Sequence, residues 1–317
     1  MKIGILTFHS ALNYGAVLQS YASVCLLRSL GHEPYVIDYE NPAIKQYSNP
    51  LAWDKERFRQ DGIKYILKRP VLDVKRLRRA CAFRRFRSQY LPMLPYSRAA
   101  EMDLLLVGSD QVWNKELTGG PDQVYFGNIL PSVRKVAWAA SAGKATLSAE
   151  DIRSIRQNFA SVSVREQSLA DLIPGSVLLP DPTMMLTADQ WQRLVKPVEG
   201  SYVLAYAILH QDEVMENARA EAERNRMPLL VVSPGIKLGS SWIQTASPDE
   251  FVSLFRHAAH VVTSSFHGAV FTTLFDRPHT FVHHLDPRFS TLLQTDLQSA
   301  RAAAASFLED ILQPCQR

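Results

Sequence analysis

The sequence predicts an α/β protein made of two doubly wound parallel sheets, one in each half of the chain. Short runs of aliphatic residues alternate with helical patterns throughout, which is typical of βαβ units. The 317 residues also suffice for two domains of roughly 150 residues each. We therefore expect an N-terminal domain over residues 1–180 and a C-terminal domain over residues 181–317.

The first half begins with a strand, KIGIL, and a helix, AVLQSYASVCLLRSLG, closed by Gly31. EPYVIDY predicts the second strand, and a basic helical insertion follows over about residues 50–98. Three further strands are expected in MDLLLVGSD, KVAWAASAG and SVSVRE, and SVLLPDP ends the half with two prolines. SAEDIRSIRQNF predicts a helix with Ser148 and Asp151 as its capping box, and QSLADLI predicts a short helix.

The second half repeats this rhythm after Trp191. Strands are expected in SYVLAYAI, PLLVVSP, HVVTSS and PHTFVHH. Helices are expected in DEVMENARAEAERN, SPDEFVSLFRHA, GAVFTTLFD and the terminal TDLQSARAAAASFLEDILQ, and Ser247 with Glu250 forms a second capping box. In such sheets ligands bind beyond the carboxyl ends of the strands. The polar residues at those ends are therefore the functional candidates.

Composition excludes several classes of protein. Hydrophobic content of 46% and charged content of 21% are ordinary for a globular protein. No apolar run approaches the roughly 20 residues of a membrane span, and the start lacks the features of a secretory signal. Cys25, Cys81 and Cys315 have neither a disulfide pattern nor metal-ligand spacing. We expect a cytoplasmic protein without a metal.

The segment Lys64–Arg87 is strongly basic, with ten Lys and Arg residues against the single acid Asp73. Apolar residues interleave with these cations at helical spacing. The segment is either a solvated helix face or a surface that attracts anionic lipid at the inner face of the membrane, or an anionic substrate. No nucleic-acid-binding motif accompanies the charge.

Two polar clusters follow strands of the first half. Thr7–Gly15 contains His9, Asn13 and Tyr14 and leads into a helix. It is either a tight turn that needs Gly15, or a site for an anion or hydroxyl at a helix start. No GxGxxG or Walker A pattern is present, so a nucleotide cofactor is not expected.

The second cluster, VGSDQVWN, places Asp110, Gln111, Trp113 and Asn114 after a buried strand. Asp110 is either a helix N-cap or a base directed at a ligand. An aromatic face beside side-chain amides would suit a pyranose ring.

Two more clusters carry charge. Arg165 and Glu166 end SVSVRE, as a structural ion pair or as an arginine placed for phosphate or carboxylate recognition. In VVTSSFHG a strand leads through Ser264 and Ser265 to His267 and Gly268 at a helix start. A lone histidine is usually structural, but these neighbours favour a functional one.

The segments GILTFHSALNYGAVLQSYA, VIDY, VGSDQVWN, SVRE, LPDPTMMLTADQW and SPDEFVSLFRHAAHVVTSSFHGAVFTTLFDRP stand in the order and spacing of the polysaccharide pyruvyl transferase family. The chain resembles that family from about residue 2 to residue 278. The resemblance implies two Rossmann-like domains facing across a cleft, as in GT-B glycosyltransferases. It also implies phosphoenolpyruvate as donor co-substrate, a sugar hydroxyl pair as acceptor, and a pyruvate ketal and phosphate as products.

By this resemblance Arg165 matches the arginine that holds the donor, and His267 matches the histidine before glycine in the family's C-terminal motif. That motif reads Arg-Leu-His-Gly in better-studied members, whereas Ser265 occupies the arginine position here. One expected phosphate contact is therefore missing. Ser264, Ser265, helix N–H groups or another arginine would have to replace it.

We hypothesise that His267 is the general acid, Arg165 the electrostatic clamp, and Asp110 or His9 the general base. The donor-binding set comprises Arg165, Ser264, Ser265 and Gly268. The acceptor-binding set comprises Asn13, Tyr14, Gln111, Trp113 and Asn114. The acceptor is a polysaccharide or its lipid-linked precursor.

Two alternatives remain open. One is a GT-B-like glycosyltransferase that uses a nucleotide sugar, with Asp286 as a ribose-binding carboxylate. The other is a non-catalytic saccharide-binding relative, which the serine at position 265 favours.

Overall fold

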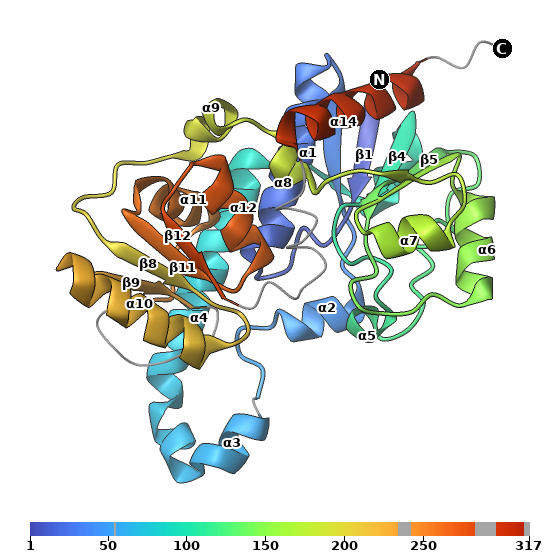
Figure 1. Ribbon diagram of the computed structural model, residues 1–317. Helices are drawn as coiled ribbons and strands as arrows, with labels where there is room; N and C mark the ends of the chain where they lie inside the picture. Colours follow the sequence, from blue (N-terminus) through green and yellow to red (C-terminus); the bar gives the residue numbers. More distant parts are fainter. Residues whose placement is uncertain (54, 234–241, 283–295, 314–317) are drawn as a thin grey trace.

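The computed structural model describes residues 1–53, 55–233, 242–282 and 296–313 of the chain. It contains two parallel β-sheets with helices packed around them (Figure 1). The predicted fold class, two doubly wound Rossmann-like domains, is confirmed because every strand pairing in both sheets is parallel.

The first sheet has the strand order β3-β2-β1-β4-β5-β6-β7. Its strands are β1 (Lys2–Leu6), β2 (Glu33–Asp38), β3 (Met93–Pro95), β4 (Leu104–Gly108), β5 (Arg134–Ala140), β6 (Ser161–Val164) and β7 (Val177–Leu178). Its helices are α1 (Tyr14–Ser29), α2 (Pro42–Tyr47), η1 (Tyr96–Glu101), α5 (Lys115–Thr118), α6 (Ala149–Asn158) and α7 (Gln167–Leu172). The predicted capping box of Ser148 and Asp151 is confirmed at the start of α6.

The second sheet has the order β10-β9-β8-β11-β12. Its strands are β8 (Val203–Tyr206), β9 (Leu229–Val232), β10 (Trp242–Ile243), β11 (His260–Thr263) and β12 (His279–Phe281). Its helices are α10 (Gln211–Asn225), α11 (Pro248–His257) and α12 (Phe266–Leu274). The second capping box, Ser247 with Glu250, is also confirmed.

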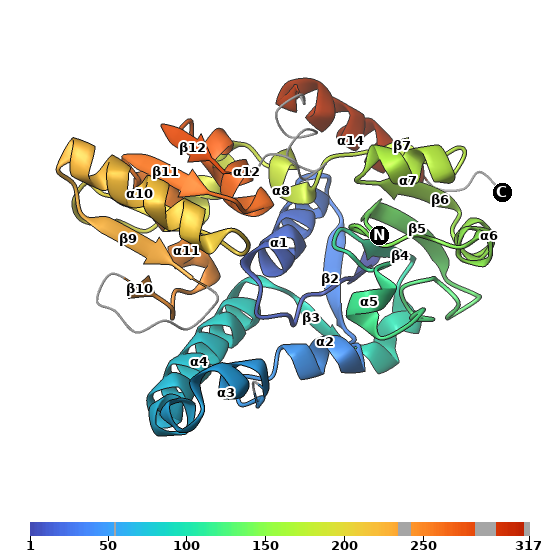
Figure 2. The same ribbon diagram turned by 60° about the horizontal axis from the view of Figure 1, so that its bottom comes forward.

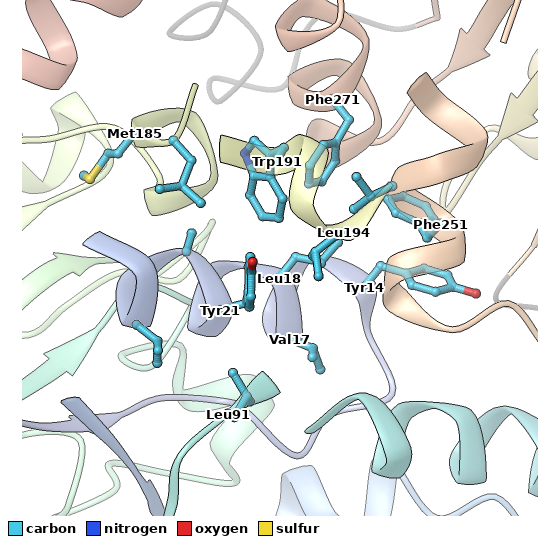
Figure 3. Packing of buried hydrophobic residues seen from close by; sticks show 14 of the residues in the cluster. Tyr14, Val17, Leu18, Tyr21, Leu91, Met185, Trp191, Leu194, Phe251 and Phe271 are labelled. Atoms are coloured by element: carbon cyan, nitrogen blue, oxygen red, sulfur yellow. The ribbon is translucent and has the colours of Figure 1, made fainter. Parts of the chain in front are cut away.

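The two domains share a hydrophobic core built around α1, in which most residues are buried. The rings of Tyr14 and Phe251 stack with centroids 4.2 Å apart, and Trp191 meets Phe271 edge-on at 4.9 Å (Figure 3). The segment between the sheets forms α8 (Pro182–Met185), α9 (Ala188–Trp191) and η2 (Gln192–Leu194). The domains therefore meet through packed apolar side chains.

The terminal helix α14 (Leu297–Leu312) lies beside the first sheet (Figure 1). Phe307 stacks on Trp138 of β5 with ring centroids 6.1 Å apart. Arg134 donates a hydrogen bond to the carbonyl of Ile311 at 2.7 Å. The end of the chain thus packs on the domain in which the chain begins.

The basic insertion forms α3 (Lys55–Asp61) and the long α4 (Ile63–Tyr90), which project from the first domain (Figure 2). The predicted bounds of 50–98 are too wide, because β3 pairs with β2 in the sheet. A proline-flanked segment fits there since β3 is an edge strand. Within the described residues no helix is long and apolar enough to cross a bilayer.

Candidate functional site

A cluster of buried and partly buried charged residues lies where the two domains meet. Asp110 follows β4, Arg165 follows β6 and Asp181 follows β7, so all three come from the carboxyl ends of parallel strands. His267 joins them from the first turn of α12, directly beyond β11. The topology thus brings residues of both domains together at the sheet edge where ligands of such folds bind.

The salt bridge between Arg165 and Asp181 is the centre of this cluster. The two side chains are 4% and 0% exposed, and a guanidinium nitrogen of Arg165 donates a hydrogen bond to Asp181 Oδ2. Glu166 Oε1 lies 3.8 Å from Arg165 Nε. Burial alone would lower the pKa of Arg165, but the neighbouring carboxylates of Asp181, Glu166 and Asp110 outweigh it and raise that pKa. Arg165 is therefore a fixed cation.

Asp181 also caps a helix and faces the histidine. Its Oδ1 accepts hydrogen bonds from the backbone N–H and hydroxyl of Thr183, at 2.9 and 2.7 Å, at the start of α8. Its Oδ2 lies 3.5 Å from Nε2 of His267. Burial would raise the pKa of Asp181, but Arg165, His267 and Thr183 together hold it well below its usual range. Asp181 is therefore an anion that orients one residue from each domain.

His267 packs against the first loop of the chain. Its side chain is 14% exposed, and a Cβ atom placed on Gly15 would lie 2.1 Å from its Nδ1. Gly15 is thus required because only a residue without a side chain leaves room for the imidazole. The Thr7–Gly15 segment therefore lies against the imidazole of His267.

Asp110 lies on a sharp turn after β4. Gly108 and Ser109 both have positive φ, at 140° and 73°. The Ser109 carbonyl accepts a hydrogen bond from Arg165 at 3.4 Å, which ties the turn to the salt bridge. Asp110 is partly exposed as a residue, whereas protein atoms surround its carboxyl group. This burial raises the pKa of Asp110 despite the opposing charges of Arg165 and His267.

The ring of His9 is bonded to residues outside this cluster. Its ring is buried, with Nε2 3.0 Å from Asp38 Oδ1 and Nδ1 3.2 Å from the Thr7 carbonyl. The hydrogen bond to His9 is the main reason that the pKa of Asp38 is lowered. Both ring nitrogens of His9 are engaged, so Asp110 is the better placed of the two candidate bases.

Two of the predicted acceptor contacts are wrong. Trp113 is fully buried, and its indole N–H donates to the Tyr125 carbonyl at 2.9 Å. Tyr14 is 1% exposed, and its hydroxyl donates to the Ala246 carbonyl at 2.9 Å. Both rings belong to the core, because their single polar groups are satisfied by backbone carbonyls inside it. Neither presents a face to a saccharide.

Of the other predicted acceptor residues, Asn13 and Gln111 lie nearer the surface, whereas Asn114 is buried. Asn13 is exposed and caps α1 by accepting a hydrogen bond from the Ala16 N–H at 3.3 Å. Asn114 caps α5 and donates to Gln111 Oε1 at 2.9 Å. Gln111 is partly exposed and closely approaches Gly143, where a Cβ would lie 2.2 Å from its Oε1. Gln111 and Asn13 therefore remain accessible to a ligand.

The predicted donor residues of the SSFHG segment have local structural roles as well. Ser264 donates a hydrogen bond to the Leu209 carbonyl, and the Ser265 N–H donates to Thr263 Oγ1 at 3.1 Å. A Cβ on Gly268 would lie 2.4 Å from Thr263 Oγ1. The glycine thus allows α12 to pack on β11, and its part in donor binding stays a prediction.

Asp181 is the functional candidate that sequence reasoning missed. Its Asp-Pro pair was visible as a helix start, with the aspartate as N-cap and Pro182 in the first turn. This local pattern does not indicate the long-range pairing of Asp181 with Arg165. The predicted Asp286 lies outside the described residues. In the described part of the chain no three His, Cys, Asp or Glu side chains are grouped to hold a metal ion.

Comparison with known proteins places this geometry in context. The family model for polysaccharide pyruvyl transferase matches residues 13–285. No curated protein sequence matches the chain significantly. Similar solved structures include UDP-GlcNAc 2-epimerase from Neisseria meningitidis bound to UDP-GlcNAc, with 9% identity, a TM-score of 0.45, and coverage of 99% of this chain and 100% of that one.

Two further solved structures are similar at the same level. The glycosyltransferase SsfS6 from Streptomyces sp. SF2575 has 13% identity and a TM-score of 0.41, covering 98% of this chain and 91% of that one. UDP-GlcNAc 2-epimerase from Methanocaldococcus jannaschii has 8% identity and a TM-score of 0.43, covering 100% and 94%. Resemblance at this level carries no information on substrate.

Proposed function

Because the chain belongs to the polysaccharide pyruvyl transferase family, we propose that it transfers pyruvate from phosphoenolpyruvate to a pair of sugar hydroxyls. The acceptor is a polysaccharide or its lipid-linked precursor, and the products are a pyruvate ketal and phosphate. The observation that carries the proposal is the Asp181 carboxylate, which contacts Arg165 of one domain and His267 of the other.

The reaction requires one proton donor and one proton acceptor. A proton is added to the methylene carbon of phosphoenolpyruvate, which leaves C2 as an oxocarbenium-like electrophile. The first hydroxyl attacks C2 and loses its proton to a base. Phosphate then leaves, and the second hydroxyl adds to C2 with loss of its proton, closing the ketal ring. A positioned acid or base contributes roughly 10²–10⁴-fold to such a rate.

The described residues fit these roles as follows. His267 is the acid, because its side chain is partly exposed and its Nε2 lies 3.5 Å from the Asp181 carboxylate, at the point where the two domains meet. Asp110 is the base, because a raised pKa strengthens a carboxylate as proton acceptor. Arg165 supplies a fixed positive charge next to both.

The direct test is incubation with phosphoenolpyruvate and candidate lipid-linked oligosaccharides, followed by phosphate measurement and mass analysis of the saccharide. We expect equal amounts of phosphate and of added pyruvate. Consumption of a nucleotide sugar instead would identify a glycosyltransferase, and saccharide binding without phosphate release would identify a non-catalytic binder. His267→Ala is expected to abolish turnover with an unchanged melting temperature. An unchanged rate would remove His267 from the mechanism.

We also propose that α4 docks the enzyme on an anionic membrane, at the inner face where lipid-linked acceptors are assembled. Its outward side carries an apolar stripe at helical spacing: Ile63, Ile66, Leu67, Val71, Val74 and Leu77, each between 41% and 74% exposed. The opposite side, including Phe83 and Phe86, is buried. A solvated helix would instead be polar on its outer side.

Cations accompany this stripe. Lys64, Arg78 and Arg85 are exposed beside it, and the two arginines line a shallow hollow with Val74 and Leu77. Apolar side chains flanked by Lys and Arg favour the surface of a bilayer with anionic headgroups. This arrangement supports membrane docking over a simple solvated face.

A further inference from the structure

Arg79 is a buried cation that the mechanism above does not use. It lies on α4 and is 7% exposed. Its guanidinium carbon lies 5.0 Å from the ring centroid of Tyr14 and 5.3 Å from that of Phe83. One terminal nitrogen donates to the Leu12 carbonyl at 3.0 Å, while Nε is buried without a hydrogen-bond acceptor.

The two arginines that are buried in the described part of the chain, Arg79 and Arg165, differ in their charge compensation. Arg165 is bonded to Asp181 and lies close to Glu166. Arg79 forms no ion pair with any residue in the described ranges. Burying an uncompensated charge is costly, so a guanidinium in this position favours an anion from outside the chain.

Arg79 is connected to the candidate site through Tyr14 and the adjoining Gly15. It contacts the ring of Tyr14, and the next residue, Gly15, touches His267. On the other domain Tyr206 packs edge-on against Tyr14 with ring centroids 6.2 Å apart. The side chain of Tyr206 interacts with that of Ser265, and the charge of Arg79 is near enough to oppose the rise in the pKa of Tyr206 that burial causes.

The acidic residues of the cluster make a second cation necessary. Asp110, Glu166 and Asp181 all act on Arg165, so its positive charge is already offset by carboxylates. A ligand with both a phosphate and a carboxylate needs positive charge that the protein has not neutralised.

We propose that Arg79 supplies this charge and binds the anionic groups of the donor at the junction of the domains. The inference rests on the proposed function. It assigns α4 two roles, membrane contact through its outer side and donor binding through its inner side. It also accounts for Ser265 at a position where an arginine was expected, because a cation from another helix serves the same ligand.

The test compares Arg79→Gln and Arg79→Lys with Arg156→Gln, a control that removes the same charge from an exposed position on α6. Binding of phosphoenolpyruvate, and of inorganic phosphate as a simpler probe, is measured by calorimetry. We expect Arg79→Gln to weaken phosphoenolpyruvate binding roughly 10- to 100-fold, the usual range for one hydrogen bond to a charged group. Arg79→Lys retains most of the affinity, and Arg156→Gln retains all of it.

Melting temperatures separate this role from a structural one. If Arg79 binds an anionic ligand, the ligand-free melting temperature of Arg79→Gln is equal to or higher than that of the wild type. Phosphoenolpyruvate then raises the melting temperature of the wild type but not that of Arg79→Gln. The inference is overturned if Arg79→Gln has a lower ligand-free melting temperature than the wild type and phosphoenolpyruvate still raises it. The two proposals fail differently, since a wild-type protein that binds no phosphoenolpyruvate refutes the proposed function, whereas equal binding by the wild type and Arg79→Gln refutes only this inference.

Discussion

The imidazole of His267 rests directly on the backbone of Gly15, where a Cβ would approach Nδ1 to 2.1 Å. These residues lie more than two hundred positions apart and belong to different domains. The contact fixes the position of the proposed acid relative to the loop that precedes α1.

Gly15→Ala is therefore expected to destabilise the protein by about 1–3 kcal/mol, the usual cost of overpacking, and to reduce turnover by displacing the imidazole. The measurement is a double-mutant cycle by urea denaturation with His267→Ala as the second substitution. The loss of unfolding free energy caused by the added methyl group should largely disappear in the His267→Ala background, where the imidazole is absent. Equal costs in both backgrounds would show that the contact does not constrain the histidine.

Asp181→Asn removes the counter-ion of a buried arginine and is expected to cost about 3–5 kcal/mol of stability. The lowered pKa of Asp181 gives this contribution a definite pH dependence. It is fully present above the ordinary aspartate pKa of about 4 and is lost as the pH falls toward the lowered folded value. Thr183→Val is a useful control, since it removes a hydrogen bond from an uncharged donor to the same carboxylate.

Denaturation curves of the wild type and Asp181→Asn should therefore converge as the pH falls below about 4. A difference that stays constant down to pH 2 would contradict the salt bridge as its source.

The pH dependence of kcat/KM should report Asp110. Its raised pKa means that the carboxylate accepts a proton at a pH above the ordinary aspartate range, so the rate falls as the pH drops through that raised value. In Asp110→Asn the residual activity should lack this acidic limb. A limb that persists unchanged in the variant would assign the base to another residue, with His9→Gln as the next variant to measure.

Membrane docking is tested by sedimentation with vesicles that contain phosphatidylserine or only phosphatidylcholine. The wild type should bind the anionic vesicles, and Leu67→Glu should bind them several-fold more weakly because a carboxylate replaces an exposed apolar side chain. Leu172→Glu on α7 is the matched control, since Leu172 is also an exposed leucine. Equal binding of anionic vesicles by the two variants would contradict docking through α4. Self-association of the protein through the apolar stripe of α4 would contradict it as well.

Local patterns in the sequence predicted the fold well. Both capping boxes and the alternation of strands with helices are confirmed, because each depends on residues a few positions apart. The position of Trp113 could not be predicted in this way. An aromatic residue beside amides has the same local sequence whether it faces a ligand or the core, and only the packing of Tyr125 and Phe159 around it decides.

The same limit applies to the site. Arg165 and His267 could be singled out because each ends a strand or begins a helix. The role of Asp181 depends on a partner sixteen residues away, and that of Arg79 depends on a loop sixty-seven residues away. Such pairings follow from the tertiary fold and produce no recognisable spacing of residues in the sequence.

The return of α14 to the first sheet means that the polypeptide passes between the domains twice, once before β8 and once after β12. A body joined to another at two separate points cannot swivel freely about either one. His267 contacts both Asp181 and Gly15 from the opposite domain, so any separation of the domains would break both contacts together.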